Sequence, residues 1–146
     1  MMHFGDLEAL AWRSQRELQA LTALLHEAEA TTRAAIEALE GGAVRVFRAR
    51  SERGRSRALA DMAAAIERSA GQFTEAAALA RALAREARAA LDTLATQPRC
   101  APQQPLVKTI LAVEAEARRL ADEAETLVAL VVHLRARGQH QLATSR

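Results

Sequence analysis

Apolar residues recur at alternating steps of three and four along most of this sequence, and no other feature limits its fold so strongly. This spacing keeps the apolar side chains on one stripe of an α-helix, because a helix has about 3.6 residues per turn. A stripe of this kind is stable only when it packs against another one, so the sequence predicts an all-α bundle. The stripe of the first segment consists of Leu7, Ala11, Ser14, Leu18, Leu21, Leu25, Ala28, Thr32, Ala35 and Leu39.

Two further segments carry the same pattern. The second stripe begins at Leu59 and ends at Leu94, and the third begins at Leu106 and ends at Leu134. Together with residues that commonly start and stop helices, the stripes predict where the helices lie. We expect three long helices, at residues of about 6–40, 56–96 and 105–137.

Glycines and prolines set the expected limits of these helices. Asp6 is a plausible N-cap of the first helix, and the pair Gly41-Gly42 predicts a break after it. Three prolines predict a second break, and Pro105 suits the first turn of the third helix because proline lacks an amide hydrogen. Gly138 predicts the end of that helix, followed by a polar tail at 138–146. The prolines are Pro98, Pro102 and Pro105.

Gly71 separates two interpretations of the second segment. The stripe passes through Gly71 without losing its phase. A glycine inside a helix costs only about 1 kcal/mol relative to alanine, so one long helix is the preferred interpretation. The sequence then predicts an antiparallel bundle of three heptad-patterned helices. A turn near Gly71 would instead give a four-helix up-down bundle.

Residues 41–57 form a strongly basic connection. Six arginines and one glutamate give it a charge of +5, whereas the acidic segment 6–40 carries −4. A basic helical extension and a partly ordered loop both fit this stretch. Guanidinium groups bind carboxylates and phosphates, so we expect these side chains to contact an acidic partner or another anion. The candidate contacts are Arg45, Arg48, Arg50, Arg53, Arg55 and Arg57.

Residues 127–132 are apolar around almost the whole helix circumference. A helix with this distribution is either deeply buried or covered by a partner. Two interpretations therefore stay open, the tightest part of the bundle core and an interaction surface. The candidate partner surface is Leu127, Val128, Leu130, Val131 and Leu134.

Motifs of known catalytic or metal-binding chemistry do not occur in the sequence. No histidine follows a glutamate by three residues, as the di-iron bundles require, and there is no Cys-x-x-Cys or glycine-rich phosphate loop. Glu114 and Arg118 have the spacing of an ordinary ion pair on a solvated helix face. We expect no metal and no cofactor, and we expect that the protein is not an enzyme.

Size and composition complete the prediction. The 146 residues fit a single domain, and half of them are hydrophobic, although many are alanine. Alanine buries little apolar area, so we expect a thin core that a second copy of the chain would stabilise. The net charge is only +2, and Lys108 is the one lysine among 20 basic residues. The sequence predicts no signal peptide and no membrane span, which favours the cytoplasm.

These features favour a helical protein–protein interaction module, such as a scaffold, an adaptor or a secretion-type chaperone. We expect it to form a homodimer or to bind a partner protein through helices. The alternative is a nucleic-acid-associated protein that contacts phosphates through the stretch from Arg45 to Arg57. Such binding would weaken steeply as salt is added.

Overall fold

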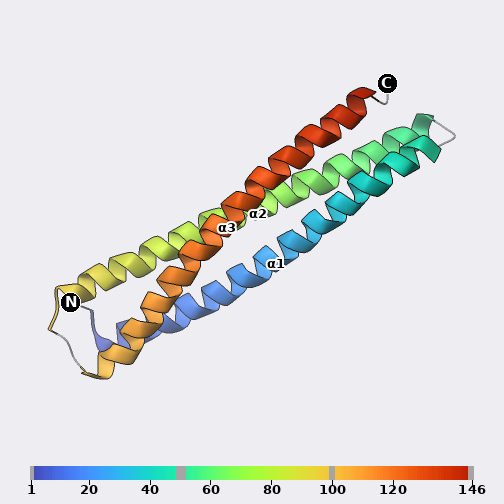
Figure 1. Cartoon of the computed structure of the whole chain (residues 1–146). Helices are drawn as coiled ribbons and strands as arrows, with labels where there is room; N and C mark the ends of the chain where they lie inside the picture. The colour runs from blue at the N-terminus through green and yellow to red at the C-terminus, as the bar shows by residue number, and fades with distance from the viewer. Residues whose placement is uncertain (1, 49–51, 99–100, 145–146) are drawn as a thin grey trace. The chain divides into compact units, whose positions relative to one another are not determined.

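Three long helices contain almost all of the residues that the computed structural model describes, which are 2–48, 52–98 and 101–144 (Figure 1). Helix α1 spans Phe4–Arg48, α2 spans Glu52–Ala95 and α3 spans Gln104–Thr144. A single turn of 3-10 helix, η1, precedes α3 at Ala101–Gln103. No strand occurs in these three ranges. The prediction of an all-α fold built from three long helices is confirmed.

Helix α2 continues through Gly71 without interruption. This glycine is exposed, and its backbone does not adopt a positive φ angle. The four-helix alternative, which needed a turn near Gly71, is therefore not supported. The unbroken phase of the apolar stripe correctly predicted a continuous helix at this position.

The helices are longer than the apolar stripes that predicted them. Helix α1 passes Gly41-Gly42 and ends at Arg48, α2 already begins at Glu52, and α3 passes Gly138 to reach Thr144. The expected connection at 41–57 is thus helical wherever it is described. Backbone hydrogen bonds need no apolar stripe, and two glycines cost only about 2 kcal/mol relative to alanine. The stripes therefore predict that the helices exist but do not predict where they end.

Local hydrogen bonds mark two of the helix ends. The amide of Leu7 donates to the carbonyl of His3 at 3.0 Å, so Asp6 lies in the first turn rather than at the N-cap. Its carboxylate still suits the positive end of the helix dipole. At the predicted proline break, α2 ends at Ala95 and the amide of Gln97 donates to the carbonyl of Leu94 at 3.1 Å.

The chain divides into two compact units, and each helix contributes residues to both. The first unit consists of Met1–Leu24 and Glu75–Ala124, and the second of Leu25–Thr74 and Glu125–Arg146. All three helices supply the core of the first unit. Its main buried cluster is Leu7, Leu10, Ala11, Ala87, Ala90, Leu91 and Ile110.

The second unit has its own buried side chains. Phe73 has no exposed surface, and Ile66 and Leu25 are buried as well. Two hydroxyl groups are also buried here, and each donates to the carbonyl four residues earlier in its helix. Thr32 does so at 2.9 Å and Ser69 at 3.2 Å, so both meet the hydrogen-bonding needs of buried polar groups.

The core is rich in alanine, as the composition predicted. Among the described residues, eleven of the 24 buried apolar side chains are alanines. Each of them removes much less apolar area from water than a leucine at the same place. Both units therefore depend on a few large side chains, of which Phe73 is the bulkiest that is fully buried.

Candidate functional site

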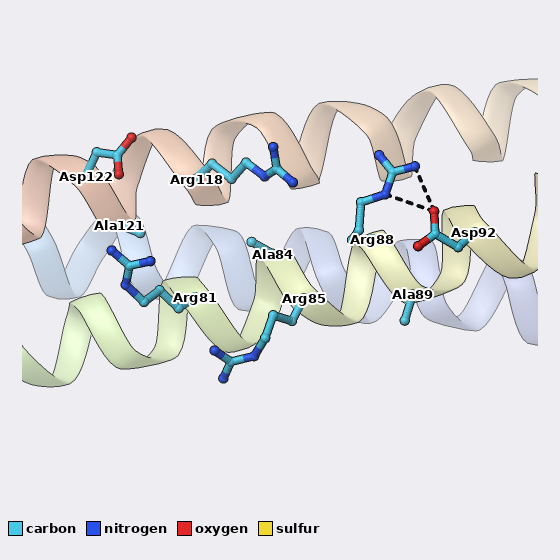
Figure 2. A pocket seen from close by; sticks show the side chains of 9 residues that line it. All are labelled: Arg81, Ala84, Arg85, Arg88, Ala89, Asp92, Arg118, Ala121 and Asp122. Carbon is cyan, nitrogen blue, oxygen red and sulfur yellow. Dashed lines mark hydrogen bonds and ion pairs between the residues drawn. The ribbon is translucent and has the colours of Figure 1, made fainter.

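An open groove between α2 and α3 in the first unit collects positive charge (Figure 2). Its volume is about 570 Å³. Three arginines come from α2 and one from α3, while small alanine side chains lie between them. We call this feature the arginine groove. It is lined by Arg81, Ala84, Arg85, Arg88, Ala89, Asp92, Arg118, Ala121 and Asp122.

The spacing of the arginines along α2 explains why they share a face. Arg81, Arg85 and Arg88 follow each other at steps of four and three, the same steps that bring the buried residues of a helix together. They follow the edge of the buried stripe to which Ala84 and Ala87 belong. In Figure 2, Arg81 extends from α2 toward α3. The three side chains therefore start on one line along α2, although in Figure 2 the guanidinium of Arg85 points away from α3.

Glu114 joins the two sides of the groove by ion pairs. Arg88 of α2 donates from Nη1 to its Oε2 at 3.3 Å, and Nη2 of Arg118 lies 2.8 Å from its Oε1. The contact with Arg118 is an ion pair without hydrogen-bond alignment. Glu114 is only 6% exposed. The prediction of a solvated Glu114–Arg118 pair was therefore right about the partners and wrong about the solvation.

The arginines of the groove differ in how they are held. Arg88 also donates to Asp92, at 2.9 Å from Nη2 and 3.1 Å from Nε (Figure 2). This hydrogen bond, followed by the charges of Asp92 and Glu114, raises the pKa of Arg88 above its ordinary value. Within the described part of the chain, Arg85 forms no ion pair or side-chain hydrogen bond. Its guanidinium is therefore available to a ligand.

A second groove lies between α1 and α2 of the same unit, and it is apolar. Its volume is about 220 Å³. Leu79 lines it and remains 47% exposed, whereas Leu21 and Leu83 are buried at its base. We call it the leucine groove. It is lined by Glu17, Ala20, Leu21, Leu24, Leu79 and Leu83.

The apolar run of α3 is divided between the core and the surface of the second unit. Val131 and Leu134 are buried, and Leu127 and Val128 are half-buried. Leu130 is exposed by 39%. Val131 and Leu134 therefore pack inside the unit. A partner that approached this run would meet mainly Leu130 and Val132, which is 55% exposed, together with the half-buried side chains of Leu127 and Val128.

Only part of the basic stretch can be placed. Arg53 and Arg57 are exposed on α2. Arg50 lies outside the described residues. The helices include Arg45, Arg48 and Arg55, but their side chains are outside the described part of the structure. Arg53 and Arg57 are one helical turn apart and face solvent, so they are accessible to an anion.

Sequence reasoning missed the arginine groove because its members look ordinary one at a time. Arg118 is 30 residues beyond Arg88 in the sequence, and only the pairing of α2 with α3 brings it to the same groove. The spacing of Arg81, Arg85 and Arg88 was the available signal. Three like charges at steps of four and three repel one another along a helix. Such a line of arginines favours an anionic contact.

Two further observations concern chemistry and membranes. In the described ranges, histidine, cysteine and acidic side chains form no group of three or more that could hold a metal ion. None of the helices, as far as they are described, contains an apolar stretch long enough to cross a membrane.

No protein-family model, curated protein or solved structure matches the chain.

Proposed function

We propose that this protein is a non-enzymatic helical interaction module, acting as a scaffold, an adaptor or a secretion-type chaperone in the cytoplasm. It associates with itself as a homodimer through an apolar helix face. The leucine groove is the observation that carries this proposal. It leaves leucine side chains in contact with water beside a core that is rich in alanine.

The chemistry of the leucine groove suits an incoming helix. Each Å² of apolar surface removed from water contributes about 25 cal/mol, so covering Leu79 and its neighbours is favourable. The groove lies between two helices, and an amphipathic helix can insert a leucine or alanine into such a seam. Glu17 at its edge would set the orientation of a basic side chain on the partner.

The order of contacts supports an antiparallel arrangement of α1 and α2 in the first unit, as the sequence predicts for the bundle. Leu7, near the start of α1, shares a buried cluster with Leu91, near the end of α2. Leu21, further along α1, lines the leucine groove with Leu79, which is earlier in α2. Antiparallel neighbours allow the short connections between consecutive helices.

Replacing Leu79 with glutamate tests the proposal. Leu79 is 47% exposed, so the charge adds little strain to the folded unit but opposes burial in a dimer. We expect Leu79→Glu to weaken self-association by about tenfold or more, measured as mass against concentration in analytical ultracentrifugation. Circular dichroism should show unchanged helix content.

Leu111→Glu is the matched control, because Leu111 is equally exposed at 47% and lies on α3 outside the leucine groove. The control should keep the dissociation constant of the unmodified chain. A chain that stays monomeric at all concentrations, or equal effects of the two substitutions, would contradict self-association through this groove.

Nucleic-acid association through the basic stretch remains the alternative. The exposure of Arg53 and Arg57 favours it. Phosphate contacts alone give binding that tolerates any sequence, and neither a nucleic-acid-binding motif nor a set of stacking aromatic residues accompanies these arginines in the sequence. The interaction module is therefore better supported.

A further inference from the structure

The arginine groove has the geometry of a binding site for a row of anions. Arg81, Arg85 and Arg88 extend over seven residue steps of α2, which is about 10 Å at 1.5 Å per residue. Arg118 adds a fourth cation from α3. Guanidinium forks bind carboxylates and phosphates, often through two parallel hydrogen bonds. A ligand for this groove should therefore present several acidic groups in line.

The base of the groove carries small side chains. Ala84 and Ala121 are buried between the two helices and carry only a methyl group each. Small side chains let a partner backbone approach closely. A helix with carboxylates at steps of four and three presents them as one stripe, and this stripe matches the spacing of the three arginines on α2.

Two carboxylates in the groove distinguish a helix from a polyphosphate or nucleic acid. Asp92 and Asp122 line it beside the four arginines. All charged groups of a nucleic-acid backbone are negative phosphates, so a strand that followed the groove would bring like charge close to both aspartates. A helix can place lysine or arginine at those positions and glutamate elsewhere. The mixture of charges therefore favours a protein ligand.

The sequence also separates a foreign helix from a second copy of this chain. None of its 18 acidic residues belongs to a set of three at successive steps of four and three, in either order. A second copy has no acidic stripe of matching spacing to offer. We propose that the arginine groove binds an acidic amphipathic helix of a different protein, with carboxylates on Arg81, Arg85 and Arg88 and basic residues near Asp92 and Asp122.

The groove is partly organised before a ligand arrives. Arg88 is held by Asp92 and Glu114, and Arg118 by Glu114, so binding would immobilise these two side chains little further. Arg85 has no partner among the described residues, and in Figure 2 it points away from α3. A carboxylate can therefore reach Arg85 without breaking an existing ion pair. Arg85 is the residue whose change should affect the ligand and nothing else.

Two designed peptides test the inference. Both are fluorescent, alanine-rich helices of about 18 residues, a length at which such helices begin to form. The stripe peptide carries three glutamates at steps of four and three with a lysine near each end. The control peptide has the same composition, with the glutamates distributed around the helix. Fluorescence anisotropy with the full chain should give at least about tenfold tighter binding for the stripe peptide.

Variants of the protein locate the binding. Arg85→Glu should weaken binding of the stripe peptide by about tenfold, because attraction is replaced by repulsion. Arg16→Glu is the control, since Arg16 is exposed on α1 of the same unit and does not line the groove. It should leave the dissociation constant within about twofold of its original value.

Three results would overturn the inference. They are equal binding of the two peptides, an Arg85→Glu variant that binds the stripe peptide normally, and tighter binding of duplex DNA or inorganic polyphosphate that Arg85→Glu abolishes. The inference goes beyond the proposed self-association and uses a different surface. Sedimentation of the same samples distinguishes a failure of this inference from a failure of the proposed self-association. If the stripe peptide does not bind but the dimer is intact, only the acidic-helix ligand is rejected.

Discussion

At the scale of single residues, Glu114 is the least ordinary side chain in the first unit. It is almost completely buried, whereas its partners Arg88 and Arg118 keep about half or more of their side-chain surface in water. Burying a carboxylate is unfavourable unless cations compensate its charge. The two arginines therefore stabilise the buried carboxylate of Glu114, whereas much of their own side-chain surface stays hydrated.

This asymmetry gives a prediction. Replacing both Arg88 and Arg118 with alanine leaves the carboxylate of Glu114 buried without a partner, and we expect a loss of about 2 kcal/mol in unfolding free energy. Glu114→Met removes the buried charge itself and should change stability by less than about 1 kcal/mol, because methionine is similar in volume and apolar. Urea unfolding at neutral pH measures both. A larger loss in Glu114→Met than in the double variant would contradict this account.

At the scale of secondary structure, Gly71 is a weak point within a continuous helix. A methyl group added at its Cα would meet no atom within 4 Å, and the backbone is already helical. Alanine restricts the unfolded chain and favours the helix at the same time. The position therefore combines a flexible residue with a conformation that every residue can adopt.

Gly71→Ala should raise the unfolding free energy by about 0.5–1 kcal/mol, observed as a higher urea midpoint with an unchanged slope. Gly5→Ala is a useful comparison. It also meets no neighbouring atom but lies in the first turn of α1, where the gain should be smaller. A decrease in stability at Gly71 would indicate that α2 bends there.

The sequence predicted the helices better than their ends. Steps of three and four indicate which side chains face a neighbouring helix. Most of these positions are buried within helices from Leu7 to Thr32 and again from Ile110 to Leu134. Nothing in that signal reports where hydrogen bonding stops. The sequence therefore did not predict that helix α1 continues through Gly41-Gly42.

The arginine groove was not predictable in the same way. It depends on which turn of α3 lies beside Arg88, and that register is set by packing between residues far apart in the sequence. The leucine groove was not predictable either. Leu79 lies outside the apolar stripe of its segment, and it forms a groove only because Leu21 and Leu24 of α1 lie beside it. Sequence periodicity identifies a face, whereas a groove requires two faces in known register.

At the scale of the whole molecule, alanine-rich cores imply modest stability for a single chain. The free energy of unfolding is a small difference between large opposing contributions, so a core that buries less apolar area gives a smaller free energy of unfolding. A second copy that binds only the folded state adds stability in proportion to the logarithm of protein concentration. The stability of the proposed homodimer should therefore depend on protein concentration, whereas that of a monomer would not.

The midpoint of thermal unfolding should rise with protein concentration. Across about a hundredfold range a dimer gains about 2.7 kcal/mol, which is about 1.4 kcal/mol for each chain and corresponds to roughly 3–5 °C for a chain of this size. Circular dichroism melts of the unmodified chain should show this rise, and Leu79→Glu should reduce it. Melting curves that superimpose at all concentrations would mean that folding and association are independent.

The chemical identity of the cations in the arginine groove has a consequence for regulation. All four are arginines, and the one lysine of the sequence, Lys108, is exposed elsewhere on α3. Lysine acetylation removes a charge, whereas methylation of arginine preserves it. Lysine acetylation therefore cannot remove any of the positive charges that line this groove. Charge-based control of binding would therefore act on the ligand, for example by phosphorylation beside its carboxylates, whereas arginine methylation would act by blocking paired hydrogen bonds.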